Sequence, residues 1–195
     1  MLSFLQDFKS SIAILAITLT ICSSQVAVAQ GTAETKPKIG TTQKLGDIIL
    51  VGLPAAALGT SLIIGDEQGA WQFTKGLLLT TGITYGLKYS INKTRPDYSN
   101  DNAFPSGHTS TIFHSAGYIH RRYGFKYSVP AYVLAGFTAA SRIDSKKHDI
   151  LDVTAGAIIG LGSNLLFTTP YQREHIMLTY SSNKNMHAIG LLYKF

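Results

Sequence analysis

Three short clusters decide how this sequence is interpreted: KYSINKTRP at residues 88–96, PSGH at residues 105–108 and SRIDSKKHDILD at residues 141–152. Each cluster combines groups that can bind an oxyanion with a group that can transfer a proton or act as a nucleophile. Mainly apolar segments lie between the clusters, so a folded chain can bring them together. The sequence therefore predicts one site that binds and processes phosphate.

Composition restricts the class of protein. The 195 residues suffice for one domain with a real core. Charged residues make up only 14%, against about 25% in typical soluble domains, which predicts helices buried on most sides or lying in a membrane. The net charge of +6 favours an anionic substrate or a lipid surface. Cys22 is the single cysteine, so an internal disulfide and a cysteine metal site are excluded.

Residues 1–29 have the pattern of a secretory signal peptide. Lys9 precedes an apolar run from Ile12 to Ile21, and Ala-Val-Ala at residues 27–29 supplies small residues before the expected cleavage point. The run is shorter than the about 20 apolar residues of a membrane span. An uncleaved anchor helix is the alternative. Residues 30–44 are polar and predict a flexible lead-in.

A helical domain is expected over residues 45–169. The apolar segments predict helices at 45–64, 70–90, 107–123, 129–142 and 148–167. We expect the first to bend at Pro54, and Pro130 to lie in the first turn of the fourth. Gly and Ala in the last helix allow close helix–helix approach. In the tail, residues 170–195, apolar residues alternate on either side of Asn183-Lys184-Asn185, which predicts a β-hairpin.

The third cluster holds a candidate nucleophile. His148 and Asp152 are four residues apart and would share one face of a helix. A carboxylate bonded to one imidazole nitrogen makes the other a better nucleophile or base, and Arg142 can bind phosphate oxygens. The alternative is a structural histidine at a helix start, stabilised by a capping carboxylate.

In the second cluster, Ser106-Gly107-His108 lies where a loop enters a helix. Free backbone N–H groups and the helix dipole favour an anion there, and Gly107 allows close approach. Ser106 adds a hydroxyl, and His108 can protonate a leaving oxygen. Simple N-capping by Ser106 is the alternative.

In the first cluster, Lys88 and Arg95 can neutralise phosphate charge. Two such residues can also belong to a solvated helix end. The remaining histidines lack carboxylate or cysteine companions at metal-ligand spacing, so we expect no metal site and no cofactor; they are His114, His120, His175 and His187.

Together the clusters resemble the type 2 phosphatidic acid phosphatase (PAP2) superfamily. Its pattern is Lys, six residues, Arg-Pro; then Pro-Ser-Gly-His; then Ser-Arg, five residues, His, three residues, Asp. Residues 88–152 match every motif position. The superfamily includes lipid phosphatases, bacterial class A acid phosphatases and vanadium haloperoxidases.

The resemblance implies an all-α bundle of about five to six helices and metal-independent hydrolysis of phosphate monoesters or pyrophosphates. His148 would attack phosphorus and form a phosphohistidine, oriented by Asp152. His108 would protonate the leaving group and then activate water. The phosphate oxygens would be held by Lys88, Arg95, Ser106, Gly107 and Arg142.

The expected location is the bacterial inner membrane, with the site facing the periplasm. If the apolar helices span and the signal is cleaved, the three clusters lie outside and the basic turn at residues 121–126 lies inside, as the positive-inside tendency requires. A lipid phosphate is then the expected substrate: phosphatidate, a prenyl pyrophosphate or lipid A. The alternative is a soluble periplasmic acid phosphatase acting on small phosphate esters. No nucleic-acid partner is expected.

Two other classes remain open on the sequence. A vanadium-dependent haloperoxidase would use a similar pocket, although such proteins are usually larger and nothing here marks a halide site. A non-enzymatic envelope scaffold would use the tail to dock on another protein.

Overall fold

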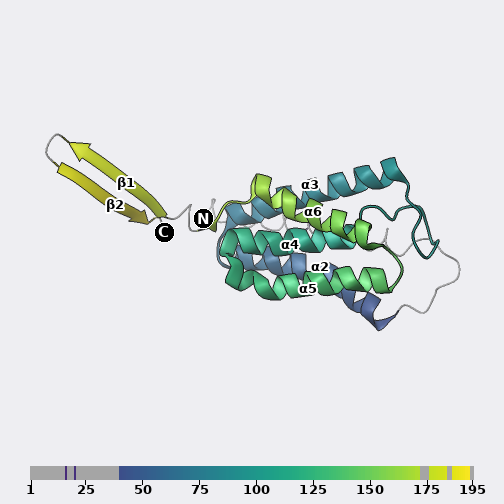
Figure 1. The fold of residues 1–195 in the computed structure, drawn as a ribbon. Helices are drawn as coiled ribbons and strands as arrows, with labels where there is room; N and C mark the ends of the chain where they lie inside the picture. The colour runs from purple at the N-terminus through teal and green to yellow at the C-terminus, as the bar shows by residue number, and fades with distance from the viewer. Residues whose placement is uncertain (1–15, 17–19, 21–39, 172–175, 184–185, 194–195) are drawn as a thin grey trace.

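A computed structural model describes residues 16, 20, 40–171, 176–183 and 186–193. Residues 40–171 form an all-α bundle of five helices, as predicted (Figure 1). The helices are α2 (Thr41–Ile63), α3 (Glu67–Ile91), α4 (Gly107–Tyr123), α5 (Phe125–Asp144) and α6 (Ile150–Phe167). Apart from two positions, the predicted signal peptide lies outside the described residues.

Helix α4 is the centre of the bundle. It packs against α2, α3, α5 and α6, and Figure 1 shows the helices running side by side around it. Many buried side chains of α4 are polar, and their hydroxyls bond to the helix's own carbonyls: Ser115 Oγ donates to Thr111 O at 3.0 Å. Such bonds satisfy most of the buried hydroxyls of α4, although Thr111 Oγ1 has no partner among the described residues. A polar helix can therefore occupy the core.

Glycines bring α6 close to α4. A Cβ added at Gly160 would lie 2.2 Å from Ser110 O and 2.7 Å from His114 N, and one at Gly156 would lie 2.6 Å from Ser106 O. These neighbours are backbone atoms that a side chain cannot push aside. The predicted close approach of the last helix is therefore confirmed.

Four of the five predicted helix starts are wrong, including that of α3, which was expected at residue 70 and lies at Glu67. Helix α5 begins at Phe125, because Gly124 adopts a φ of 105° that ends α4 and starts α5 at the same residue; Pro130 thus lies inside the helix instead of in its first turn. Helix α6 begins at Ile150 with Asp149 as N-cap, so His148 precedes it. Helix α2 begins at Thr41, inside the predicted flexible lead-in.

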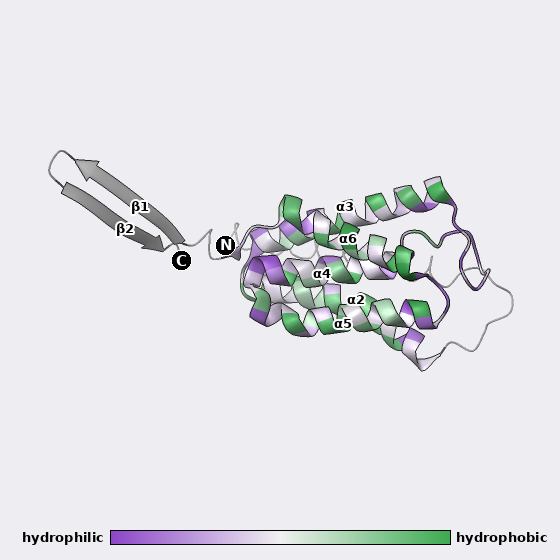
Figure 2. Cartoon of the chain, in the orientation of Figure 1, coloured by the Kyte–Doolittle hydropathy of each residue, from purple (hydrophilic) through white to green (hydrophobic). Residues whose placement is uncertain are grey.

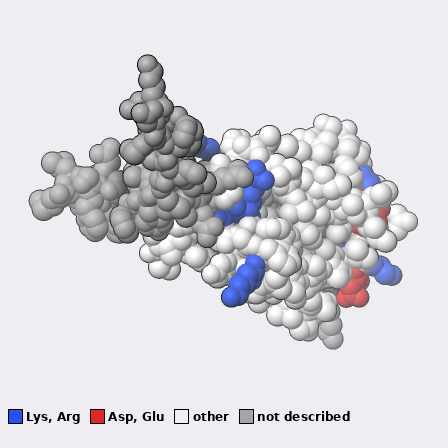
Figure 3. Space-filling view, turned by 60° about the vertical axis from the view of Figure 1, so that its left-hand side comes forward, with Lys and Arg blue, Asp and Glu red and all other residues white. Residues whose placement is uncertain are grey.

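A buried ion pair holds the end of the bundle where α4 meets α5. Arg122 donates through Nε to Asp66 Oδ2 at 2.7 Å and through Nη2 to Asp66 Oδ1. Tyr123 OH also donates to Asp66, at 2.8 Å. A cavity of about 790 Å³ lies beside this pair. Figure 3 brings this end toward the viewer and shows Lys and Arg side chains gathered at a hollow.

Two helices are long and apolar enough to cross a membrane. In an 18-residue window the mean hydropathy is 1.7 for α2 and 1.6 for α6, yet only 39% and 33% of these windows are buried. Figure 2 shows hydrophobic residues along the helices of the bundle. Much of this apolar surface therefore faces outward.

The backbone of the tail forms two strands, β1 (Ile176–Asn183) and β2 (Met186–Tyr193). They pair antiparallel, with Ile176 opposite Tyr193 and Asn183 opposite Met186.

Replacing Gly160 by alanine should destabilise the bundle by about 1–3 kcal/mol, the usual cost of overpacking. Gly162→Ala is the matched control, because the Cβ site of Gly162 is open and alanine favours a helix. Thermal unfolding of both variants measures the difference. A midpoint for Gly160→Ala as high as that of Gly162→Ala would contradict the packing argument.

Candidate active site

The eight residues predicted from the three clusters lie at one end of the bundle. Consecutive helices run in opposite directions, so the ends of α3 and α5 and the starts of α4 and α6 meet there (Figure 1). The residues are Lys88 on α3, Arg95 in the following loop, Ser106, Gly107 and His108 at the start of α4, Arg142 on α5, and His148 and Asp152 at the start of α6.

The site is rich in buried positive charge. Lys88, Arg95 and Arg142 are each no more than 3% exposed. Arg95 interacts electrostatically with Lys88, Arg142 and both predicted catalytic histidines. Like charges repel in such a setting, and an anion relieves the repulsion. The arrangement favours an oxyanion.

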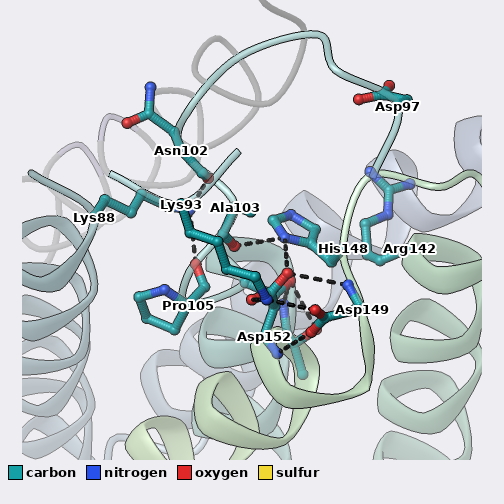
Figure 4. Close-up of polar contacts among 12 residues, drawn as sticks. Lys88, Lys93, Asp97, Asn102, Ala103, Pro105, Arg142, His148, Asp149 and Asp152 are labelled. Carbon is teal, nitrogen blue, oxygen red and sulfur yellow. Dashed lines mark hydrogen bonds and ion pairs between the residues drawn. The ribbon is translucent and has the colours of Figure 1, made fainter. Parts of the chain in front are cut away.

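The loop before α6 holds His148 mainly through the backbone. Its Nδ1 lies 2.7 Å from Ala103 O and 3.7 Å from Asp152 Oδ2, and its backbone N–H donates to Arg142 O at 3.2 Å (Figure 4). A carbonyl only accepts, so the neutral ring carries its proton on Nδ1 and its lone pair on Nε2. The predicted contact between His148 and Asp152 is present, at 3.7 Å. The two residues do not share a helix face, because His148 precedes the helix, and Ala103 O is the nearer partner.

Asp152 also belongs to a carboxylate–lysine cluster. Its Oδ1 accepts from Lys93 Nζ at 2.7 Å, and its Oδ2 accepts from Asp149 N at 3.0 Å. Asp149 caps α6 by accepting from Asp152 N at 3.0 Å, and it also bonds to Lys93. In Figure 4 these side chains point toward one another beneath His148. The cluster fixes the start of α6.

The charges around Lys93 and His148 shift their pKa values in opposite directions. Burial disfavours the charged form of Lys93, but its hydrogen bonds to Asp149 and Asp152 raise its pKa above the ordinary value. Burial lowers the pKa of His148 to about 4; Asp152 opposes this shift, and the charges of Lys88 and Arg95 add to it. His148 is therefore neutral near pH 7, as a nucleophile must be.

Ser106 serves as the N-cap of α4. Its Oγ accepts from Thr109 N at 3.4 Å, as in the alternative interpretation of this motif. Its backbone N–H donates to Asp152 O at 2.9 Å, which joins the second cluster to the third. Gly107 and His108 then occupy the first turn, where helix N–H groups have no carbonyl partner within the helix.

Lys88 ties the end of α3 to the loop before α4. Its Nζ donates to Asn102 O and to Pro105 O, both at 2.7 Å. An ammonium group has three donors. Among the described residues these two carbonyls are the hydrogen-bond partners of Lys88, so one donor remains for a ligand.

Arg142 and His108 share a partner that the motif analysis did not include. Arg142 Nη1 donates to Asp47 Oδ1 at 3.1 Å, and His108 Nε2 lies 2.8 Å from the same oxygen. Arg142 Nη2 also donates to Gln43 O at 2.9 Å. Helix α2 thus reaches the site although it carries none of the three clusters.

Sequence reasoning therefore missed Asp47, Lys93, Asp149 and the carbonyl of Ala103. Asp47 did carry a signal, because it is the one charged residue between Leu45 and Ile64. Lys93 lies inside the first cluster but at none of its motif positions. The role of the Ala103 carbonyl cannot be recognised from the sequence, because every residue has a backbone carbonyl.

Two bacterial lipid A phosphatases are similar in sequence to this chain. A lipid A 4'-phosphatase of Helicobacter pylori is 33% identical over 147 residues, which cover 70% of this chain and 74% of the relative. A lipid A 1-phosphatase of Porphyromonas gingivalis is 42% identical over 89 residues, 44% of this chain and 20% of that protein.

The fold also has a solved counterpart. The crystal structure of Aquifex aeolicus LpxE superposes with a TM-score of 0.57 and 21% identity, covering 64% of this chain and 81% of that one. The model of the PAP2 superfamily matches residues 69–175, more than half of the sequence. These matches, on a bundle that carries all three motifs at one end, show that the chain belongs to the PAP2 superfamily.

Proposed function

We propose that this protein removes phosphate from lipid A or a closely similar phosphorylated lipid at the membrane of a bacterial cell. The chain is a PAP2-type lipid phosphatase. Lipid A is proposed as the particular lipid because the similar proteins are lipid A phosphatases. The observation that carries the proposal is the buried cationic site at one end of a bundle whose outer surface is largely apolar.

The first chemical step is attack by His148. Its Nε2 forms a bond to phosphorus, the bond between phosphorus and the ester oxygen breaks, and His108 gives the departing oxygen a proton. The second step reverses these roles: His108 takes a proton from water, the water oxygen bonds to phosphorus, and the bond to Nε2 breaks. Phosphate leaves and the enzyme returns to its starting state.

The buried cations stabilise the charge of the transferring group. The first turn of α4 is surrounded by Arg95, Arg142 and the remaining donor of Lys88. The free N–H groups of this turn can also bind an anion. Such donors, fixed before substrate arrives, contribute most where charge develops in the transition state. This gives Gly107 and Ser106 their place in the site as well.

The bundle is proposed to lie in the membrane. Helix α6 has 18 residues, a length of about 27 Å, which approaches the roughly 30 Å thickness of the hydrocarbon core. Its outward residues include Ile150, Leu151, Ile158, Leu165 and Leu166, each at least 66% exposed. Water does not favour so much contiguous apolar surface, whereas lipid does.

The orientation follows from charge. The basic turn at residues 121–126 lies at the end opposite the site. In line with the positive-inside tendency, we propose that this turn faces the cytoplasm and the site faces the periplasm. A phosphate on the headgroup of a lipid would then reach the site from the membrane surface.

The substrate class is tested with purified protein in detergent, with EDTA present. We expect faster phosphate release from lipid A than from p-nitrophenyl phosphate, because the lipid can also bind the apolar surface. His148→Ala should lower either rate to background, since it removes the nucleophile. Faster release from the small ester would indicate an acid phosphatase instead, and release unaffected by His148→Ala would overturn the mechanism.

Lys93→Met should lower the rate of phosphate release at least about tenfold, because a small displacement of a catalytic group costs that much or more. The variant leaves Asp152 buried without its cation and loosens the start of α6. Lys126→Met, in the basic turn at the other end, is the control and should retain the wild-type rate. Equal rates for both variants would show that Lys93 does not support the site.

His148 should remain uncharged at pH values low enough to protonate an ordinary histidine. Because burial lowers its pKa to about 4 from 6.5, the ring should stay neutral through pH 5. Nuclear magnetic resonance of protein labelled with ¹⁵N-histidine measures this directly, with the signal identified by its loss in His148→Ala. A titration midpoint near 6.5 would contradict the burial argument.

A further inference from the structure

Helix α2 places an isolated carboxylate beside the catalytic machinery. Asp47 is the one charged residue between Leu45 and Ile64, and its side chain is 17% exposed. A carboxylate in such an apolar helix is costly unless hydrogen bonds and opposite charge compensate. Its position therefore requires an explanation.

The contacts of Asp47 are with two residues of the proposed mechanism. Oδ1 accepts from Arg142 Nη1 at 3.1 Å and lies 2.8 Å from His108 Nε2. The imidazole is nearly inaccessible, at 2% exposure. The charged groups that act on it are Asp47 from α2, Arg142 from α5 and Arg95 from the loop before α4.

This contact decides which nitrogen of His108 can take part in catalysis. A carboxylate accepts hydrogen bonds, so the proton shared with Asp47 belongs to Nε2. Among the residues that the structure describes, no group bonds to Nδ1 of His108. Nδ1 is therefore the nitrogen that can exchange a proton with a substrate.

We propose that Asp47 is a positioning residue for His108, holding Nε2–H so that Nδ1 delivers the proton to the leaving oxygen. The inference rests on the proposed phosphatase function. Before the transfer, Nδ1 takes up a second proton from the solvent or from the bound phosphate monoester. When the ester bond breaks, this proton on Nδ1 moves to the departing oxygen while Asp47 keeps Nε2–H. When water attacks the phosphohistidine, Nδ1 takes the water's proton and the cycle closes.

The two histidines then act through different nitrogens. His148 binds Ala103 O through Nδ1 and attacks through Nε2. His108 binds Asp47 through Nε2 and transfers protons through Nδ1. A carboxylate suits His108, because the ring must become positively charged in each cycle, and a neutral carbonyl suits His148, which must remain a neutral nucleophile.

A purely structural role makes a different prediction. If Asp47 serves only to neutralise Arg142, its loss should weaken binding of the phosphoryl group and slow all substrates alike. If Asp47 acts through His108, its loss should slow most the esters whose leaving oxygen needs a proton. The leaving group therefore separates the two roles.

The test measures release of the leaving alcohol in a single turnover, for an alkyl phosphate and for p-nitrophenyl phosphate. We expect Asp47→Asn to slow the alkyl ester at least about 30-fold, within the usual range for a general acid, and to slow the nitrophenyl ester less than about threefold. His108→Ala should show the same selectivity. In the double variant, Asp47→Asn should add little to the loss caused by His108→Ala.

Asp144→Asn is the matched control, because Asp144 also joins α5 to α2, by accepting from Thr42 Oγ1 at 3.2 Å, but does not contact His108. It should leave both rates unchanged. Equal slowing of the two esters by Asp47→Asn, or losses that multiply in the double variant, would overturn the proposal. Failure of the wild-type protein to release either alcohol would overturn the proposed function itself.

A measurement on the wild-type protein does not depend on a variant of Asp47 that folds. Nitrogen chemical shifts of ¹⁵N-labelled histidine distinguish the two neutral tautomers, and the His108 signals are identified by their loss in His108→Ala. We expect the proton on Nε2 of His108 and on Nδ1 of His148. A proton on Nδ1 of neutral His108 would overturn the proposal.

Discussion

The contact between α4 and α6 is the constraint on which the site depends. Gly156 and Gly160 leave no room for a side chain, so the two helix backbones meet directly. At the site end of this contact, Ser106 N–H donates to Asp152 O and joins two motifs that are far apart in the sequence. Without this close approach, the start of α4 could not face the loop that carries His148.

Around that contact lie several cations, some bonded to neutral backbone carbonyls and others paired with carboxylates. Lys88 donates to two backbone carbonyls, and Arg142 bonds to Asp47 and to Gln43 O. Lys93 compensates the carboxylates at the start of α6. The carbonyls fix the cations in place without neutralising them, so the positive field remains available to a phosphoryl group.

The interior of the bundle combines hydrophobic clusters with many polar side chains, while much of the surface of α2 and α6 is apolar. The buried side of α4 carries hydroxyls and histidines, most of which bond to a neighbouring carbonyl or side chain, as His114 does with Ser163 Oγ and Phe73 O. Apolar residues of α2 and α6 face outward. This suits a bundle whose surroundings are lipid, because lipid offers no hydrogen bonds to polar groups.

The sequence by itself determined the helices and the chemistry. The apolar segments predicted all five helices, and α4 was correct at both ends. The three motifs predicted eight residues that do meet at one end of the bundle. These properties depend on residues close together in the chain. They can be recognised because helix periodicity and motif spacing are local.

Only the tertiary structure decided which groups orient the side chains that we propose to be catalytic. Asp47 lies 61 residues from His108 and 95 from Arg142, and Ala103 lies 45 from His148. Such contacts depend on how each helix is rotated and how far it slides along its neighbours, and no local pattern carries that information. His148 itself lies outside α6 because Asp149 caps the helix after it, and the carbonyl that holds its ring belongs to Ala103, in the loop before α4.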